Sequence, residues 1–233
     1  MKILNNHIVF QVETNAGLRN VLLDTGAGMT RSFDHDVHAV TINGRMYPAH
    51  LEPIDEHPDL VPTINKMIGT EVSAFVGPDV LETSDVLIDF ENNTIEFGAA
   101  RPEGGCTIDL GSYGGLPLLN MTVNGSDLRV GFDTGAQYPF VKVPLVDKLN
   151  LGEPIGQFQD FNPFLGYFTP SLYVGNIKLG TCDLYAVNLA VSPRYDETIR
   201  HLRVDGFLGI NCLIENKVKV WISYANEQMV IVK

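Results

Sequence analysis

The alternation of apolar and polar positions along the chain predicts mostly β-strands. Residues 86–97 and 220–231 each contain two alternating segments on either side of a short turn that includes asparagine. Alternation around such a turn is typical of a β-hairpin. Helical spacing is confined to short pieces at 64–68, 144–149 and 198–202. The pattern therefore predicts an all-β protein with little helix.

These elements occur twice in the same order. Each half has an apolar strand that ends in Asp-Thr-Gly-Ala, at residues 24–27 and again at 133–136. After a long middle segment, each half has two apolar residues and a glycine, at 75–77 and at 207–209. A closing hairpin follows in both. Self-similarity at about half the chain length indicates a duplicated structural unit.

The repeat also predicts the domain organisation of this 233-residue chain. Glycine and proline cluster between the two copies, in a segment with few apolar residues. We therefore expect an N-terminal lobe at residues 1–98, a linker at 99–117 and a C-terminal lobe at 118–233.

The repeated tetrapeptide has the residue types that a carboxylate site needs. The glycine permits a close backbone approach, and the threonine can hydrogen-bond to backbone and brace the turn. The aspartate is then held at the turn, so two facing turns would place two carboxyl groups together. The predicted catalytic residues are Asp24 and Asp133, and the predicted supporting residues are Thr25, Gly26, Ala27, Thr134, Gly135 and Ala136.

Two adjacent carboxyl groups have a defined chemistry. Both cannot ionise cheaply at close range, so one apparent pKa rises and the pair holds a single proton. The ionised carboxylate can then act as general base on a water molecule, while the neutral one donates a proton to a carbonyl oxygen. The duplicated motif therefore predicts hydrolysis.

The two Asp-Thr-Gly-Ala motifs and the two apolar-apolar-glycine segments resemble those of aspartic peptidases of the retropepsin and pepsin type. The similarity is greatest to retropepsins and retropepsin-like bacterial proteins and covers about residues 8–98 and 118–232. It implies the acid-protease fold, with two pseudo-twofold-related β-barrel lobes in one chain. It also implies an endopeptidase that takes an extended peptide or protein substrate without metal or cofactor. With both motifs in one chain, we expect a monomer.

The resemblance implies further features outside the two motifs. Terminal strands knit such lobes together, so residues 3–10 and 229–233 are expected to pair in a sheet between the lobes. Glycine-containing hairpins cover the cleft, and the second lobe offers residues 160–167 for this role. In the first lobe, residues 31–40 and the turn at Gly44 both remain candidates. The flap residues expected to bind substrate are Asn162, Gly166, Tyr167 and Gly44.

The residue after each glycine departs from the pepsin pattern. Ala27 and Ala136 stand where pepsins usually carry serine or threonine. A missing hydroxyl removes a hydrogen-bond donor to the carboxylate, so the carboxyl pKa values should rise. We therefore predict hydrolysis nearer neutral pH than in a gastric enzyme.

Charge, hydropathy and cysteine content limit the remaining possibilities. The net charge of −12 argues against nucleic acid and anionic membranes as partners. No apolar run reaches the roughly 18 residues that span a bilayer, and no signal peptide is evident, so a cytoplasmic location is expected. The three cysteines are widely spaced and predict neither a disulfide framework nor a zinc site. His35 and His38 have no identifiable third metal ligand, and nothing near the cysteines suggests a nucleophilic thiol.

One functional alternative stays open at this stage. A chain with this fold could act as a peptide-binding or assembly module with little or no catalysis, since a fold does not fix a function. The presence of both aspartates and both threonines favours the enzyme. The separation of the two carboxyl groups distinguishes the alternatives, because the coupling that divides their pKa values is short-ranged.

Overall fold

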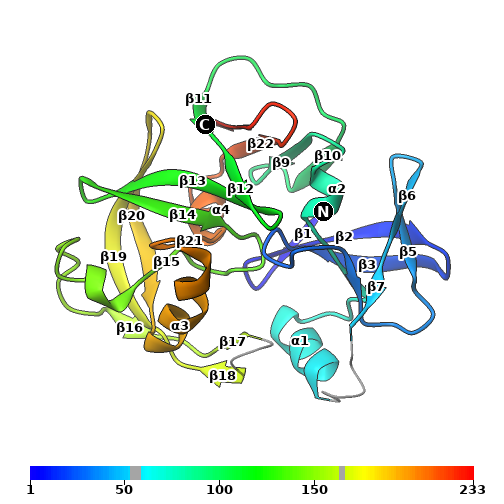
Figure 1. Cartoon of the computed structure of the whole chain (residues 1–233), viewed down its shortest axis with the longest axis horizontal. Helices are drawn as coiled ribbons and strands as arrows, with labels where there is room; N and C mark the ends of the chain where they lie inside the picture. The colour runs from blue at the N-terminus through cyan, green and yellow to red at the C-terminus, as the bar shows by residue number, and fades with distance from the viewer. Residues whose placement is uncertain (53–58, 163–165) are drawn as a thin grey trace.

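The computed structural model describes residues 1–52, 59–162 and 166–233. Strands dominate and helices are few and short, as the alternating pattern predicts. Figure 1 shows the strands of the first half on one side of the molecule and those of the second half on the other. A third group of strands lies above the space between them in this view.

The sheet of the first half is built around the hairpin that leads into the first Asp-Thr-Gly motif. Its strands are β1 (Lys2–Leu4), β2 (His7–Thr14), β3 (Gly17–Leu23), β4 (Arg31–Ser32), β5 (Ala39–Ile42), β6 (Arg45–Pro48), β7 (His50–Leu51) and β8 (Ala74–Val76). Their order is β6-β5-β2-β3-β8-β4-β7, with β1 paired to β2. β8 runs parallel to β3, so the apolar-apolar-glycine segment lies beside the strand that ends at the motif.

The sheet of the second half has the same central arrangement. Its strands are β12 (Gly111–Tyr113), β13 (Leu116–Val123), β14 (Ser126–Phe132), β15 (Phe140–Val141), β16 (Gly156–Gln157), β19 (Ser171–Leu179), β20 (Cys182–Val191) and β21 (Gly206–Leu208). β21 runs parallel to β14, as β8 does to β3. β13 pairs with both β14 and β19, which closes this sheet into a ring. A separate hairpin consists of β17 (Asp160–Asn162) and β18 (Gly166–Phe168).

A third sheet joins the two halves. It contains β9 (Val86–Asp89), β10 (Thr94–Phe97), β11 (Cys106–Asp109), β22 (Lys219–Ser223) and β23 (Gln228–Val232), in the order β10-β9-β22-β23-β11. The two closing hairpins predicted from the sequence meet here, through antiparallel pairing of β9 with β22. The segment expected to be a linker supplies β11 and β12.

The prediction for the terminal strands needs a correction. The C-terminal strand β23 does enter the sheet between the halves, but the N-terminal strand β1 pairs with β2 in the first half. The edge of β23 that was expected to pair with the N-terminal strand pairs with β11. A two-residue turn joins β1 to β2, so β1 pairs with its neighbour in the chain and β11 is left to pair with β23.

Asparagine sets the turns of three hairpins. Asn43, Asn93 and Asn124 have positive φ angles of 49°, 53° and 46°. Asparagine tolerates this left-handed conformation better than most residues, and turns of this kind match the twist of paired strands. The hairpins expected around 86–97 and at the start of the second half are therefore confirmed.

An ion pair spans the sheet between the halves. Lys219 Nζ lies 2.9 Å from Asp89 Oδ2, on strands β22 and β9 where the two residues are register partners. Asp89 Oδ1 also accepts hydrogen bonds from the backbone N–H groups of Glu91 and Asn92, at 3.0 and 2.9 Å. Burial opposes ionisation of Asp89, but the hydrogen bonds from Asn92 and the contact with Lys219 outweigh it and lower the pKa to about 2.

Removal of this carboxylate should destabilise the protein in a pH-dependent way. A pKa lowered from 3.8 to about 2 corresponds to about 2 kcal/mol, which is present above pH 4 and is lost as pH falls toward 2. We expect Asp89→Asn to lower the free energy of unfolding by about that amount at pH 7, measured by urea denaturation. Asp147→Asn, at an exposed position, is the control. An Asp89→Asn effect that is equal at pH 7 and pH 2 would contradict the assignment.

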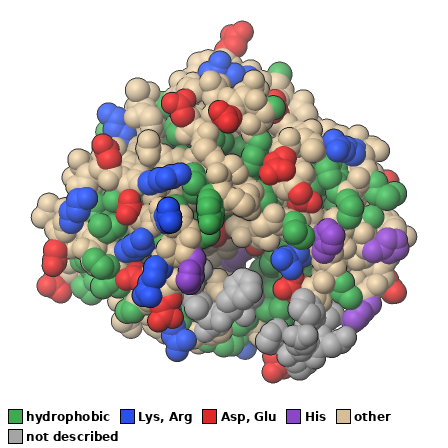
Figure 2. All heavy atoms as spheres, viewed as in Figure 1, with side chains coloured by type: hydrophobic (Ala, Val, Ile, Leu, Met, Phe, Trp, Pro, Cys, Tyr) green, Lys and Arg blue, Asp and Glu red, His purple; other side chains and the backbone are tan. Residues whose placement is uncertain are grey.

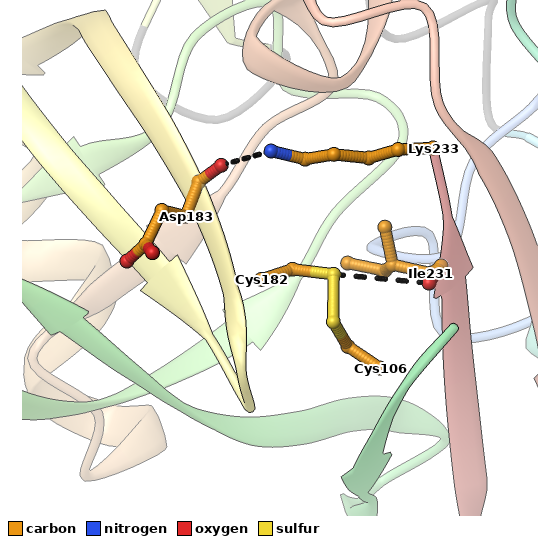
Figure 3. The surroundings of a disulfide bond; sticks show 5 residues. All are labelled: Cys106, Cys182, Asp183, Ile231 and Lys233. Carbon is orange, nitrogen blue, oxygen red and sulfur yellow. Dashed lines mark hydrogen bonds between the residues drawn. A yellow bond between two sulfur atoms is a disulfide. The ribbon is translucent and has the colours of Figure 1, made fainter. Parts of the chain in front are cut away.

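The structure contains a disulfide bond that the sequence analysis did not predict. Cys106, at the start of β11, is bonded to Cys182, at the start of β20, with a Cα–Cα distance of 5.7 Å. Figure 3 shows the bond beside β23, where Cys182 Sγ lies 3.8 Å from the carbonyl oxygen of Ile231. Lys233 Nζ donates a hydrogen bond to the carbonyl oxygen of Asp183 nearby. The bond therefore ties the third sheet to the ringed sheet of the second half.

Loss of the disulfide should be costly. It links residues separated by 76 positions, and closing a loop of that size restricts the unfolded chain by about 4 kcal/mol in the chain-entropy description. We expect the double variant Cys106→Ser, Cys182→Ser to lose about 2–4 kcal/mol of unfolding free energy. Dithiothreitol should lower the midpoint of the wild type to a similar extent and leave that of the double variant unchanged. Equal stability of the two proteins without reductant would disprove a structural role.

The helices are short, and their ends follow simple rules. They are α1 (Leu60–Ile68), α2 (Pro78–Leu81), the 3-10 helix η2 (Val143–Leu145), α3 (Pro193–Leu202) and α4 (Asn211–Glu215). α1 ends at Gly69, whose φ of 84° suits glycine. Ser192 caps α3 by accepting a hydrogen bond from Arg194 N–H. The helix expected at 144–149 is confined to the single turn of η2.

No helix among the described residues has the length and apolar character needed to cross a membrane. The main apolar core runs through both halves of the molecule. It includes Leu23 from β3, Phe132 from β14 and Ile222 from β22, all at most 1% exposed. Since one cluster contains residues from all three sheets, the two halves are held against each other by a shared core.

Candidate active site

The two Asp-Thr-Gly turns lie at equivalent places in the two halves. Asp24 follows β3 and its N–H donates to the carbonyl oxygen of Val76 at 2.9 Å. Asp133 follows β14 and its N–H donates to the carbonyl oxygen of Leu208 at 3.1 Å. Strands β8 and β21 thus support the two turns in the same way, as the repeated apolar-apolar-glycine segments indicate.

The glycine of each of these segments is required by a close chain crossing. A Cβ atom on Gly77 would lie 2.3 Å from the backbone carbon of Met29. On Gly209 it would lie 2.3 Å from the carbonyl oxygen of Tyr138. Because real Cβ atoms do not approach backbone so closely, only glycine lets the chain after each turn pass over its supporting strand.

The two turns are joined by their threonines. Thr25 N–H donates to Thr134 Oγ1 at 3.0 Å, and Thr134 N–H donates to Thr25 Oγ1 at 2.9 Å. Each hydroxyl also donates across the molecule, Thr25 to the carbonyl oxygen of Phe132 and Thr134 to that of Leu23, at 2.7 and 2.8 Å. Both threonines have no exposed surface. This reciprocal set of buried hydrogen bonds fixes one turn relative to the other.

The turns bring the two carboxyl groups together. Within each turn the glycine N–H donates to the aspartate Oδ1 at 2.9 Å. A Cβ atom on Gly26 would lie 2.6 Å from Asp133 Oδ1, and one on Gly135 would lie 2.7 Å from Asp24 Cγ. Each carboxyl therefore lies against the backbone of the opposite turn, in space that only glycine leaves free.

The surroundings disfavour ionisation of both carboxyl groups. Burial raises the pKa of Asp24 well above its ordinary value, and the charge of Asp133 and a hydrogen bond with it raise the pKa further. Burial also raises the pKa of Asp133, although the hydrogen bond from Gly135 N–H acts in the opposite direction and lowers it. Two carboxyl groups in such contact can share one proton, because the second negative charge is costly at close range.

A cavity of about 200 Å³ opens next to the carboxyl groups. Figure 2 shows the surface hollowed between the two halves on the face that it presents. The first half supplies most of the large apolar lining residues, together with His7, Arg31 and Glu52, and the second half supplies Phe161, Asp160 and Tyr195. The large apolar lining residues are Leu22, Phe33, Leu60, Ile64, Met67, Ile68, Phe75 and Phe161. The cavity thus combines apolar surface with a few charged and polar groups.

The other predicted site residues are partly brought to this cavity. Gly26, Ala27, Gly135 and Ala136 all line it. The expected second-half hairpin is present as β17 and β18, although residues 163–165 lie outside the described ones. Asn162 lines the cavity, Gly166 has a φ of 70° at the start of β18, and Tyr167 is 49% exposed and does not line it.

The first half covers the site differently from what the resemblance implies. Gly44 lies in the turn between β5 and β6, and no residue of that hairpin lines the cavity. Arg31 and Phe33, from the other candidate segment, do line it. The remaining wall comes from α1, whose buried residues Leu60, Ile64 and Ile68 recur at helical spacing. The helical spacing at residues 64–68 was the only feature of the sequence that indicated this helix.

Three polar residues of the cavity were not predicted as site residues, although Asp160 was included in the expected flap segment 160–167. His7 is buried, its Nδ1 lies 2.7 Å from the carbonyl oxygen of Asn5, and burial lowers its pKa. Burial and then Asp133 raise the pKa of Asp160 to about 6. Burial and the three aspartates keep Tyr195 protonated by raising its pKa well above the ordinary value. None of these has a sequence signal, because each depends on which strands and helices meet at the cavity.

The free thiol has no place in this chemistry. Cys212 is fully buried, and burial raises its pKa to about 12. A cysteine nucleophile must be a thiolate, so the environment of Cys212 does not support thiol catalysis.

Comparison with known proteins shows a likeness of fold only. No known protein family and no curated protein matches the sequence. The chain is similar in structure to a retropepsin-like aspartic protease from Rickettsia conorii, with 14% identity and a TM-score of 0.36 over 56% of this chain and 95% of that one. It is also similar to the Simian Foamy Virus (mac) protease, with 18% identity and a TM-score of 0.30 over 41% of this chain and 90% of that one.

Proposed function

We propose that this protein is an aspartic endopeptidase with Asp24 and Asp133 as its catalytic pair. The observation that carries the proposal is the contact of each carboxyl group with the opposite turn, where a Cβ atom on Gly26 would lie 2.6 Å from Asp133 Oδ1. The reciprocal threonine hydrogen bonds hold the turns in this position. Preorganisation of this kind is what a hydrolytic pair requires.

The arrangement divides the chemical work between the two carboxyl groups. The ionised group accepts a proton from a water molecule, which attacks the carbonyl carbon of the peptide bond. The neutral group donates its proton to the carbonyl oxygen and so stabilises the charge that develops there. The resulting diol collapses when a proton passes to the leaving nitrogen and the carbon–nitrogen bond breaks. The raised pKa values favour the state with one proton on the pair.

The proposal includes the finer features of the acid-protease fold. The two lobes are related by a pseudo-twofold axis between Thr25 and Thr134, so a single chain supplies both halves of the site and acts as a monomer. An extended peptide lies across the cavity and adds a strand to the β17–β18 hairpin. The matching supports of Asp24 and Asp133, from β8 and β21, agree with such symmetry.

Cleavage of a peptide library by the purified protein tests this function. We expect products from internal peptide bonds, and we expect a statine-containing peptide to block their formation, because its hydroxyl imitates the tetrahedral diol. Activity between pH 3 and pH 8 should be recorded, since the raised pKa values place the active one-proton state above the range of ordinary carboxyl groups. Absence of products throughout that range would refute the proposed activity.

A binding module without catalysis is the second candidate, and one contact favours it. Phe161 of β17 packs against the apolar cluster that contains Leu60, Ile64 and Phe33 of the first half. A peptide that reaches the carboxyl groups must pass beside this contact or displace it. Library peptides that bind with measurable affinity and are recovered uncut would support this candidate.

A further inference from the structure

Asp160 is a further carboxyl group in the wall of the proposed active site, besides the catalytic pair and Glu52. It begins β17, is 5% exposed and lines the same cavity as Asp24 and Asp133. Its Oδ1 accepts a hydrogen bond from the N–H of Phe161 at 2.8 Å. For Oδ2, no hydrogen bond is found among the described residues, and none of their lysines, arginines or histidines forms an ion pair with Asp160. Such a buried carboxylate is costly unless a cation meets it.

The cationic side chains of the cavity are not available to Asp160. Arg31 is the one lysine or arginine among the described residues that line it, and its Nη1 lies 2.6 Å from Glu52 Oε2. His7 also lines the cavity, but burial lowers its pKa and favours the neutral ring. Among the described residues that line the cavity, none therefore supplies a positive charge that compensates the negative charge of Asp160.

Aromatic rings complete the surroundings of this carboxyl group. Tyr195 lines the cavity and stacks on Phe140 at 3.8 Å between ring centroids, with Phe168 at 5.0 Å. Burial and then the charge of Asp160 raise the pKa of Tyr195, and burial, Glu215 and Asp160 raise that of Tyr138, so both phenols stay protonated and uncharged. A carboxylate held against such a packed, uncharged aromatic cluster attracts a cation through a charge-assisted hydrogen bond.

We propose that Asp160 forms a subsite for a positively charged group of the substrate, either a lysine or arginine side chain or a free α-amino group. This inference rests on the proposed function and names its substrate class. The part of the cavity lined by α1 and Phe33 is apolar. The preferred substrate therefore places a large apolar side chain against α1 and a cation against Asp160.

Matched peptides test the subsite. A peptide that the protein cleaves serves as the parent. Each of its positions is replaced in turn by lysine or by methionine, which has a similar length and no charge. Each peptide is made with a free and with an acetylated N-terminus. We expect kcat/KM at pH 7.5 to favour lysine at one position by about tenfold or more, as for a hydrogen bond to a charged group. A loss on acetylation alone would identify the α-amino group as the cation.

The variant Asp160→Asn assigns any such preference to this residue. Asparagine keeps the oxygen that accepts from Phe161 N–H, so the local fold is retained while the charge is removed. We expect the lysine-to-methionine ratio to fall to about one in Asp160→Asn and to persist in Asp160→Glu and in the exposed control Asp147→Asn. A ratio near one in the wild type, or a preference unchanged in Asp160→Asn, would overturn the proposal.

Failure of the proposed function is separable from failure of the subsite. If the wild type cuts no peptide, the same lysine and methionine peptides are titrated against the wild type and Asp160→Asn by calorimetry. Tighter binding of the lysine peptide that disappears in Asp160→Asn supports the subsite in a protein that binds without cutting. Equal affinities, or no binding of either peptide, contradict it.

Discussion

Asp133→Asn is expected to reduce kcat for peptide hydrolysis by at least about 10³-fold, because a general base or acid contributes about 10²–10⁴-fold and the pair acts as a unit. The same change should raise the free energy of unfolding at pH 7. The pKa of each carboxyl group is raised in the folded state, so the associated stability is present at low pH and is lost as pH rises through the folded pKa values. A variant that lacks one of the two carboxyl groups does not lose this stability at pH 7, so its free energy of unfolding should be higher there.

The opposite directions of these two effects make the prediction specific. A residue with a merely structural role would lose activity together with stability. Asp24→Asn should behave like Asp133→Asn, and Asp147→Asn, at an exposed site, should change neither quantity. Steady-state kinetics and urea denaturation at pH 4 and pH 7 measure both. Retention of more than a tenth of the wild-type kcat in either active-site variant would contradict the assignment.

Thr25→Val is expected to have the largest effect on stability of any single substitution considered. The hydroxyl of Thr25 donates to the carbonyl oxygen of Phe132 and accepts from Thr134 N–H, and all of these atoms are buried. Valine leaves both partners unsatisfied, at about 1–3 kcal/mol each. We therefore expect a loss of about 2–6 kcal/mol in the free energy of unfolding, measured by urea denaturation.

The shape of the two turns should suffer as well. Without the reciprocal hydrogen bonds, Asp24 and Asp133 are no longer fixed against each other, and kcat should fall by at least about tenfold. Thr25→Ser is the matched control, since serine keeps the hydroxyl and loses only a methyl group. It should retain most of the activity. Equal behaviour of the serine and valine variants would show that the hydrogen bonds do not set the geometry.

The features that the sequence could predict depend on local signals or on the repeat. The hairpins around Asn93 and Asn124 follow from turn chemistry and strand alternation. The common support of Asp24 and Asp133 follows from the recurrence of apolar-apolar-glycine after each motif. Such signals survive in a single sequence because nearby residues, or a copy of the same unit, contain all the information that they need.

The features that it could not predict depend on contacts between distant segments. Cys106 and Cys182 meet only because β11 takes the free edge of β23. α1 lines the cavity because its apolar face packs on β2, β3 and β8, where a flap hairpin was expected. Asp160 was placed in a flap, but its burial beside Tyr195 depends on how β17 meets α3. Apolar spacing and charge counts do not contain that information.

The most direct test of the central claim is a titration of the aspartate carboxyl carbons by ¹³C NMR, in the wild type and in Asp133→Asn. We predict that the signals of Asp24 and Asp133 move together in two well-separated steps, with one proton on the pair between them. In Asp133→Asn, the Asp24 signal should show one step. Two independent titrations in the wild type, each near the reference aspartate pKa of about 3.9, would contradict the shared proton on which the proposed hydrolysis depends.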